Sequence, residues 1–321
     1  MTEQLILGQT SSIGAVWPPR VDDVHNRLRG FYTDSVVETP AQVDAFAASF
    51  DAARVLVQTI EGVDRLSIRA VVHAGALATL EGRHIPVEAA VPLSAATPHL
   101  VVAYAAVNQP GREMSAEHLS RHRGALAQVV SQDQNARDHT GGLASRGFSL
   151  HTVHPDDAQK LAPEFLGLYQ AFGYGIAEVE NVLASGDNAI AYVQSGDRVV
   201  STAMAERGAV TIGGLGEITL VEITEASTDP AFRGQGLYRA VSGHLAESLV
   251  KDPTINALYG ESNLTMGGVL VAAHQNGRRF SHFDQYGLRS PGFGILQQNF
   301  HVADGAEKRP YNDFAVSYYP L

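Results

Sequence analysis

One stretch of the sequence decides the fold: Glu222-Ile223-Thr224-Glu225-Ala226-Ser227-Thr228-Asp229-Pro230-Ala231-Phe232-Arg233-Gly234-Gln235-Gly236-Leu237-Tyr238. It predicts a strand, then a short loop with two glycines, then a helix. This order aims the free N–H groups of the first helical turn at one spot, which suits a pyrophosphate. Glycine lets the phosphate oxygens approach closely because it has no side chain. The alternative interpretation of the glycines alone is a tight turn that binds nothing.

Strands and helices are predicted to alternate on both sides of this stretch. The expected strands are 148–153, 189–194, 198–206, 217–226, 257–262, 295–302 and 312–319. The expected helices are 154–172, 176–184, 237–250 and 265–276. This order predicts the α/β class, with a mixed central sheet flanked by helices.

A small, polar, glycine-rich segment at 138–147 predicts a boundary between two domains, 1–147 and 148–321. The first domain is expected to be α/β as well. Its expected elements are a helix at 40–50, strands at 54–60, 66–73 and 100–107, and a long helix from about 115. Helix, three strands and helix also follow one another between 176 and 250, an order that an internal duplication would leave.

Composition limits the function classes. The chain has 321 residues, with 23 Lys and Arg against 34 Asp and Glu, a net charge of −11. Nucleic acids and anionic membranes prefer basic surfaces, so neither is expected as a partner. The absence of Cys excludes disulfides, thiolate metal sites and a Cys nucleophile. No signal peptide or apolar run long enough to span a bilayer is evident, so a soluble, cytoplasmic protein is expected.

The loop resembles the acyl-CoA pyrophosphate loop of the GNAT acyltransferase superfamily, whose pattern is [Q/R]-x-x-G-x-[G/A]. Arg233 and Gly236 match this pattern, and Tyr238 departs from it. The junction at 154–158, the strand end at Glu261-Ser262-Asn263 and the segment 277–280 resemble other parts of the same family. The resemblance covers residues 148 to about 302. The first domain has no such loop after 107, so it would be a degenerate copy if the chain is a tandem repeat.

The resemblance implies transfer of an acyl group from acetyl-CoA, or another acyl-CoA, to an amine that attacks the thioester directly. It also implies a splayed central sheet, in which the strand before the loop separates from its neighbour. No metal is expected. The residues implied to bind the acyl-CoA are Ala226, Ser227, Thr228, Arg233, Gly234, Gln235, Gly236, Leu237, Tyr238 and Asn263. For Asn263, a helix N-cap is an equally good interpretation.

Direct attack asks for a base that takes the ammonium proton and an acid that protonates the leaving thiolate. Strand alternation places Glu222 and Ala226 on one face, and Glu222 is the expected base. A structural ion pair with an Arg across the sheet is the alternative for Glu222, and Glu225 is the second candidate base. The family's Tyr acid falls at Ala273, so the neighbouring His274 is the candidate acid; unassisted departure of the thiolate is the alternative.

The acceptor is expected to be a small, cationic or amino-acid-like primary amine, because most of the excess negative charge lies after residue 147. A protein amine stays open as an acceptor. One rival interpretation is a non-catalytic acyl-CoA sensor, supported by the missing Tyr at Ala273. Another is an acyltransferase that uses a longer acyl-CoA or an acyl-carrier-protein donor, suggested by Tyr238. The protein is expected to be a monomer or a homodimer. A metal site at His118 and His122 is disfavoured because no third ligand is evident.

Overall fold

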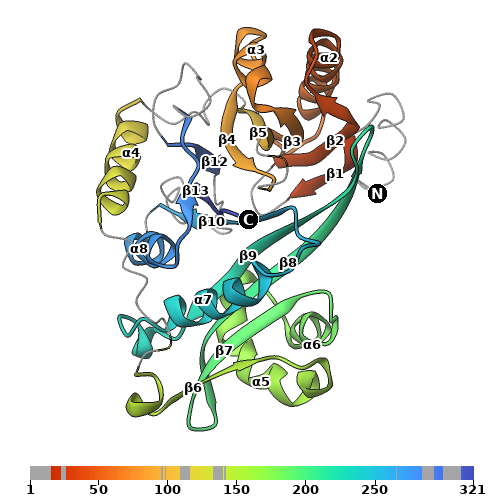
Figure 1. The fold of residues 1–321 in the computed structure, drawn as a ribbon. Helices are drawn as coiled ribbons and strands as arrows, with labels where there is room; N and C mark the ends of the chain where they lie inside the picture. Colours follow the sequence, from red (N-terminus) through yellow and green to blue (C-terminus); the bar gives the residue numbers. More distant parts are fainter. Residues whose placement is uncertain are drawn as a thin grey trace.

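The computed structural model describes residues 16–22, 27–94, 97, 99–108, 116–132, 140, 142–264, 266–283, 293–298 and 312–321. Two mixed sheets with flanking helices form the molecule (Figure 1). The first sheet comprises β1 (Val16–Asp22), β2 (Arg27–Val37), β3 (Arg65–His73), β4 (Val87–Pro92) and β5 (Leu100–Asn108). The second comprises β6 (Phe148–Thr152), β7 (Ala189–Ser195), β8 (Arg198–Ile212), β9 (Gly216–Thr228), β10 (Ala257–Asn263), β11 (Arg279–Phe280), β12 (Ile295–Gln298) and β13 (Asn312–Tyr319). The predicted α/β class with mixed sheets is confirmed.

Helices cover both sheets. They are α2 (Pro40–Val57), α3 (Leu77–Gly82), α4 (Ala116–Val130), α5 (Ala158–Tyr169), α6 (Ile176–Ala184), α7 (Leu237–Leu249) and α8 (Gly267–Gln275). In Figure 1, α2 and α3 lie together beside the first sheet, and α5 and α6 lie at the opposite end of the molecule. None of the helices in the described part of the chain has the length and apolarity needed to cross a membrane.

The strand predicted at 54–60 is wrong, because α2 continues through Val57. Thr39 starts this helix with a capping box, and the buried side chains then follow helical spacing. The apolar run at 55–57 resembles a strand locally, yet burial of one helical face decides its conformation. The predictions also missed β1, β2, α3, β4 and β11. Most of the glycine-rich segment 138–147 and residues 299–302 lie outside the described residues.

The two sheets repeat one topology. The first sheet has the order β1-β2-β3-β5-β4, and part of the second has the order β8-β9-β10-β13-β11. In both, a parallel pair of strands lies between antiparallel pairs. In both, a helix connects the two parallel strands and a second helix follows them. The elements correspond as a duplication would require, in a different alignment from the one predicted, which relied on the false strand at 54–60.

In the first sheet the loop at the position that corresponds to 229–236 is nearly absent. β2 ends at Val37 and α2 begins at Pro40, so only Glu38 and Thr39 lie between them. Neither residue is a glycine, and Gln42 and Thr39 cap one another at this helix end. The first sheet therefore has no counterpart of the second sheet's exposed glycine loop.

The sheets pack against each other through one apolar cluster. Residues such as Phe31, Val71 and Tyr104 from the first sheet meet Leu220 and Val316 from the second. The long β8–β9 hairpin reaches the first sheet in this way (Figure 1). This packing sets β3 and β5 against the face of β9 and β10.

β9 and β10 pair only over a short distance. Their parallel register runs from Ala257 opposite Leu220 to Tyr259 opposite Glu222. Beyond that pair β9 continues to Thr228 and β10 continues to Asn263 without pairing to each other. The two strands thus separate toward the glycine loop, which is the splay expected of the central sheet.

Candidate active site

The glycine loop is exposed and begins with a short helical turn. Asp229 caps the 3-10 helix Pro230–Phe232 by accepting a hydrogen bond from the Ala231 amide at 2.8 Å. Gly234 and Gly236 then take φ values of 77° and 74°, in the left-handed region that favours glycine. Gly236 is the N-cap of α7, so the first amides of the helix point outward beside an open loop. This geometry suits a phosphate group.

Two arginines hold the loop. Arg233 donates through Nε to the Thr228 carbonyl at 3.2 Å, and its side chain is exposed. Arg146, just before β6, donates through Nη1 to the Gln235 carbonyl at 2.9 Å. Arg146 is a site residue that the sequence analysis missed, because it lies far from the loop along the chain. Together the two cations add positive charge where the helix end is already positive.

A β-bulge interrupts β9 just before the loop. The β8–β9 register shifts between Thr202 and Met204, so Glu225 and Ala226 together oppose one residue of β8. Glu225 has a φ of 41°, an uncommon conformation for a residue other than glycine. The predicted alternation of faces therefore ends here: Ala226 packs against the apolar cluster beneath α7, on the other face from Glu222. The bulge also leaves backbone groups of β9 outside the regular ladder.

Glu222 lies where β9 and β10 begin to separate. Tyr259 donates its hydroxyl to the Glu222 carboxylate at 3.0 Å, and Arg69 Nη2 lies 3.7 Å from the same oxygen. The Glu222 side chain is 22% exposed. Burial, aided by the negative charge of Glu261 and opposed by Arg69, raises the pKa of Glu222 to about 7. A carboxylate with this pKa can accept a proton at neutral pH.

The sequence left two interpretations of Glu222 open, a general base and a structural ion pair with an arginine. The ion pair with an arginine exists, and its partner is Arg69 of the first sheet. Arg69 pairs more closely with Glu261, at 3.0 Å, and its guanidinium lies 4.8 Å from the centre of the Tyr104 ring. The sequence offered no signal for Arg69, because no motif contains it and β3 is distant in the chain.

Glu225 points to a different set of partners. Tyr174, between α5 and α6, donates its hydroxyl to Glu225 at 3.2 Å, and Thr224 donates to it at 2.5 Å. On β8, the pKa of Glu206 is raised by partial desolvation of its carboxylate and by the charge of Glu225. Glu206 and Glu222 are register partners. Three carboxylates from β8 and β9, those of Glu206, Glu222 and Glu225, thus lie along the second half of β9, and they favour a cation.

Tyr238 turns its side chain inward. Ser242 and Arg278 hydrogen-bond to it, and burial raises its pKa. Arg278 is 1% exposed, and a side chain on Gly260 of β10 would lie within 2.5 Å of its guanidinium. Tyr238 therefore fills space beneath α7. The large residue at a position that is usually small is accommodated away from the loop.

The structure separates His274 from the carboxylates. His274 is buried in α8, and its Nε2 lies 2.9 Å from the carbonyl of Gln132, just after α4. Its role as an acid stays a prediction. Asn263 ends β10 beyond the fork and is half-buried, and its carbonyl accepts the Met266 amide at 3.0 Å. Its role toward an acyl-CoA is likewise a prediction.

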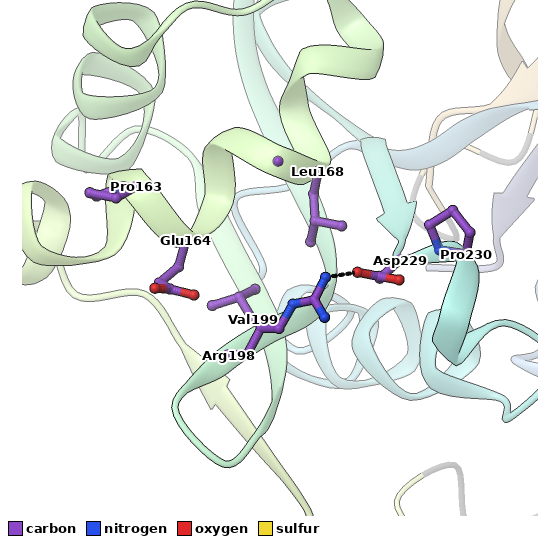
Figure 2. A pocket seen from close by; sticks show the side chains of 8 residues that line it. Pro163, Glu164, Leu168, Arg198, Val199, Asp229 and Pro230 are labelled. Carbon is purple, nitrogen blue, oxygen red and sulfur yellow. Dashed lines mark hydrogen bonds and ion pairs between the residues drawn. The ribbon is translucent and has the colours of Figure 1, made fainter.

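Figure 2 shows a pocket of about 250 Å³ beside the loop entry. It is lined by Pro163, Glu164, Gly167, Leu168, Arg198, Val199, Asp229 and Pro230. Arg198 forms an ion pair with Asp229 across it. None of the predicted site residues lines this pocket, and the Arg198 ion pair holds Asp229 at the start of the loop. Within the described residues, no group of three or more His, Asp or Glu side chains could hold a metal ion.

No family model matches the sequence, and no curated protein matches it. Solved structures do match it. Arabidopsis thaliana NAA60 in complex with acetyl-CoA is 14% identical with a TM-score of 0.40, over 54% of this chain and 97% of that one. An aminoglycoside acetyltransferase from an uncultured soil metagenomic sample, in complex with sisomicin, is 10% identical with a TM-score of 0.34, over 41% and 88%. A probable N-acyltransferase from Enterococcus faecalis V583 is 14% identical with a TM-score of 0.32, over 41% and 32%.

These similarities cover between 41% and 54% of the chain, and they carry no argument about its function. We therefore base the function on the geometry of the loop and of the carboxylates around Glu222.

Proposed function

We propose that this protein is an acyl-CoA-dependent N-acyltransferase whose acceptor is a small cationic amine. One observation carries the proposal: the exposed glycine loop before α7 follows the part of β9 that is not paired to β10, and Glu222 lies at the start of that part. A titratable carboxylate, a strand segment unpaired to β10 and an anion-binding helix end thus follow one another along the chain. Acetyl-CoA is the proposed donor. No metal takes part in the proposal.

In the proposed reaction, α7 and the loop bind the pyrophosphate, and the unpaired part of β9 lines the pantetheine arm. Glu222 takes a proton from the acceptor's ammonium group, and the free amine attacks the thioester carbonyl. The new C–N bond forms, the C–S bond breaks, and the CoA thiolate takes up the proton that the amine nitrogen loses after the attack. The chain offers no Cys for a covalent acyl intermediate, so direct attack is the simplest course.

The carboxylates support a cationic acceptor. Glu206, Glu222 and Glu225 lie on neighbouring strands, and the pKa values of Glu206 and Glu222 are raised in part by like charges. An ammonium group among them would relieve that repulsion. The acceptor proposed is therefore a small amine that carries positive charge, such as an amino acid side chain or a polyamine. A monomer or homodimer in the cytoplasm remains the prediction from the sequence.

The first experiment is to measure CoA thiol release from acetyl-CoA with a chromogenic disulfide reagent, over a panel of amines that differ in charge. Because the chain has no Cys, every thiol detected comes from CoA. Release that depends on a cationic amine supports the proposal, and Glu222→Gln should slow it by about 10²-fold or more. Equal release with anionic and cationic amines would contradict the acceptor class.

A second candidate is an acyl-CoA sensor without turnover. The sensor is favoured by the hydrogen bond between His274 and the Gln132 carbonyl. Because His274 has this partner and Ala273 replaces the expected Tyr, neither residue would supply an acid to the CoA thiolate. Calorimetric binding of acetyl-CoA without thiol release from any amine, or from longer acyl-CoA donors, would identify the sensor. Release only from longer donors would identify a different acyl specificity.

A further inference from the structure

Arg69 of the first sheet contacts Glu222, the proposed base in the second sheet. It projects from β3, and its two terminal nitrogens have different partners. Nη1 donates to the Tyr259 hydroxyl oxygen at 2.7 Å, and Nη2 donates to Glu261 at 3.0 Å. Nη2 also lies 3.7 Å from Glu222. The guanidinium packs over the rings of Tyr104 and Tyr259, so its plane is fixed by both sheets.

The chemistry of these groups sets the direction of each hydrogen bond. A guanidinium can only donate, so the Tyr259 oxygen accepts from Arg69. The single hydroxyl proton of Tyr259 is then free to point at Glu222, and it does so at 3.0 Å. Arg69 also offsets the charge of Glu261, whose carboxylate would otherwise repel that of Glu222. Both effects favour the ionised carboxylate that a base requires.

We propose that Arg69 is a positioning residue of the active site, which orients Tyr259 and Glu261 around Glu222, so that the first sheet completes the catalytic centre. The proposal rests on the function proposed above, in which Glu222 is the base. It gives the first sheet a defined role even though that sheet has only Glu38 and Thr39 where the second sheet has the glycine loop. Arg69 acts through Glu222 and has no proposed contact with the reacting atoms.

Other charged groups also face Glu222. Glu206 on β8 adds negative charge, and Arg29 on β2 offsets part of it. On β10, Tyr259 contacts Glu222 and Glu261 contacts Arg69. On β5, the Tyr104 ring packs against the Arg69 guanidinium. Among the described residues, Arg69 is the cation that lies in contact with the Glu222 carboxylate. Removal of Arg69 should therefore move the titration of Glu222 more than removal of Arg29, which acts on Glu206.

The test compares the acid limb of the pH profile of kcat/KM in variants with opposite expected shifts. Arg69→Met should move the limb to higher pH by about one unit or more, because an attractive charge is lost. Glu261→Gln should move it to lower pH, because a repulsive charge is lost. Arg69→Lys keeps the positive charge, so the acid limb of this variant should lie between the wild-type position and that of Arg69→Met. Arg83→Met, which removes an exposed ion pair with Asp44 in the same domain, is the control.

A loss of packing alone would lower activity without moving the limb in opposite directions. Shifts of the same sign in Arg69→Met and Glu261→Gln, or no shift in either, would overturn the proposal. Far-UV circular dichroism and thermal unfolding of each variant identify those that fail to fold, and Arg69→Lys supplies the folded comparison in that case.

A second readout does not depend on activity. Side-chain carboxyl resonances of ¹³C-labelled glutamate are titrated by NMR, and the resonance missing in Glu222→Gln is that of Glu222. Arg69→Met should raise the midpoint of this resonance, and Glu261→Gln should lower it. If the wild-type protein transfers no acyl group but these shifts occur, the proposed function fails while the Arg69 arrangement stands. If transfer occurs and the midpoint is unmoved, the role of Arg69 fails alone.

Discussion

Tyr259 and Glu222 are the last register partners of β9 and β10, and they are also hydrogen-bonded, at 3.0 Å through their side chains. Beyond this pair the strands separate toward the glycine loop. The same two residues therefore mark the end of the sheet ladder and hold the carboxylate that we propose as the base. Arg69 of the other sheet contacts both of them.

Loss of the proposed base should separate binding from turnover. We expect Glu222→Gln to lower kcat by about 10²- to 10⁴-fold, the usual contribution of a general base, with a similar Kd for acetyl-CoA. Steady-state kinetics and calorimetry measure the two quantities. Glu217→Gln changes an exposed carboxylate of the same strand and should leave both unchanged. A Glu222→Gln variant with wild-type kcat would place the base elsewhere.

The raised pKa of Glu222 also predicts a stability difference that depends on pH. The folded protein holds the proton of Glu222 up to about pH 7, whereas an unfolded glutamate releases it near pH 4.3. This contribution to the free energy of unfolding is present at acidic pH and is lost as the pH rises to 7. Compared with the wild type, Glu222→Gln should therefore gain up to about 4 kcal/mol between pH 4 and pH 8. Urea unfolding at several pH values tests this, and parallel pH curves would contradict it.

Substitution of the loop glycine should remove the donor site. We expect Gly236→Leu to weaken acetyl-CoA binding by about 10-fold or more, since each lost charged hydrogen bond is worth about 1.5–3 kcal/mol. The change also forces a left-handed backbone on leucine, which costs about 1–2 kcal/mol of stability. Gly214→Leu is the matched control, because Gly214 has a φ of 78° and open space around it in the β8–β9 turn. Equal acetyl-CoA affinity in both variants would refute the loop assignment.

Arg146 should support the loop from a distance. We expect Arg146→Ala to weaken acetyl-CoA binding several-fold, because the Gln235 carbonyl loses its donor and the site loses a positive charge. The affinity of the variant should also depend less on salt than that of the wild type. Arg207→Ala removes an exposed arginine that pairs with Asp252 and serves as the comparison. An identical salt dependence in all three proteins would argue against the role of Arg146.

Glu225 should affect the acceptor more than the base step. We expect Glu225→Gln to raise KM for a cationic amine several-fold while the acid limb of the pH profile stays at its wild-type position. Tyr174→Phe removes the hydroxyl that donates to Glu225 and should have a smaller effect in the same direction. If Glu225→Gln instead abolishes kcat, Glu225 is the base, and the assignment of Glu222 fails.

Local patterns sufficed for much of the second domain. The helix at 176–184 and the strand at 312–319 have the predicted limits, because each has strong periodicity and a clear boundary residue. The local pattern at 55–57 gave a wrong prediction. Its β-branched residues favour a strand, whereas burial of one helical face across α2 favours the observed helix. Tertiary packing overrides local preference at such positions.

The sequence by itself determined the strand, the glycine loop and the helix from 222 to 238, because each depends on residues that are neighbours in the chain. The position of Glu222 on β9 followed from the period of a strand. Only the tertiary structure decided what surrounds Glu222. Arg69 meets Glu261 across 192 positions of the chain, and Arg146 meets Gln235 across 89. Such contacts arise from the packing of one sheet on the other and of one loop on another, and no local period or spacing encodes them.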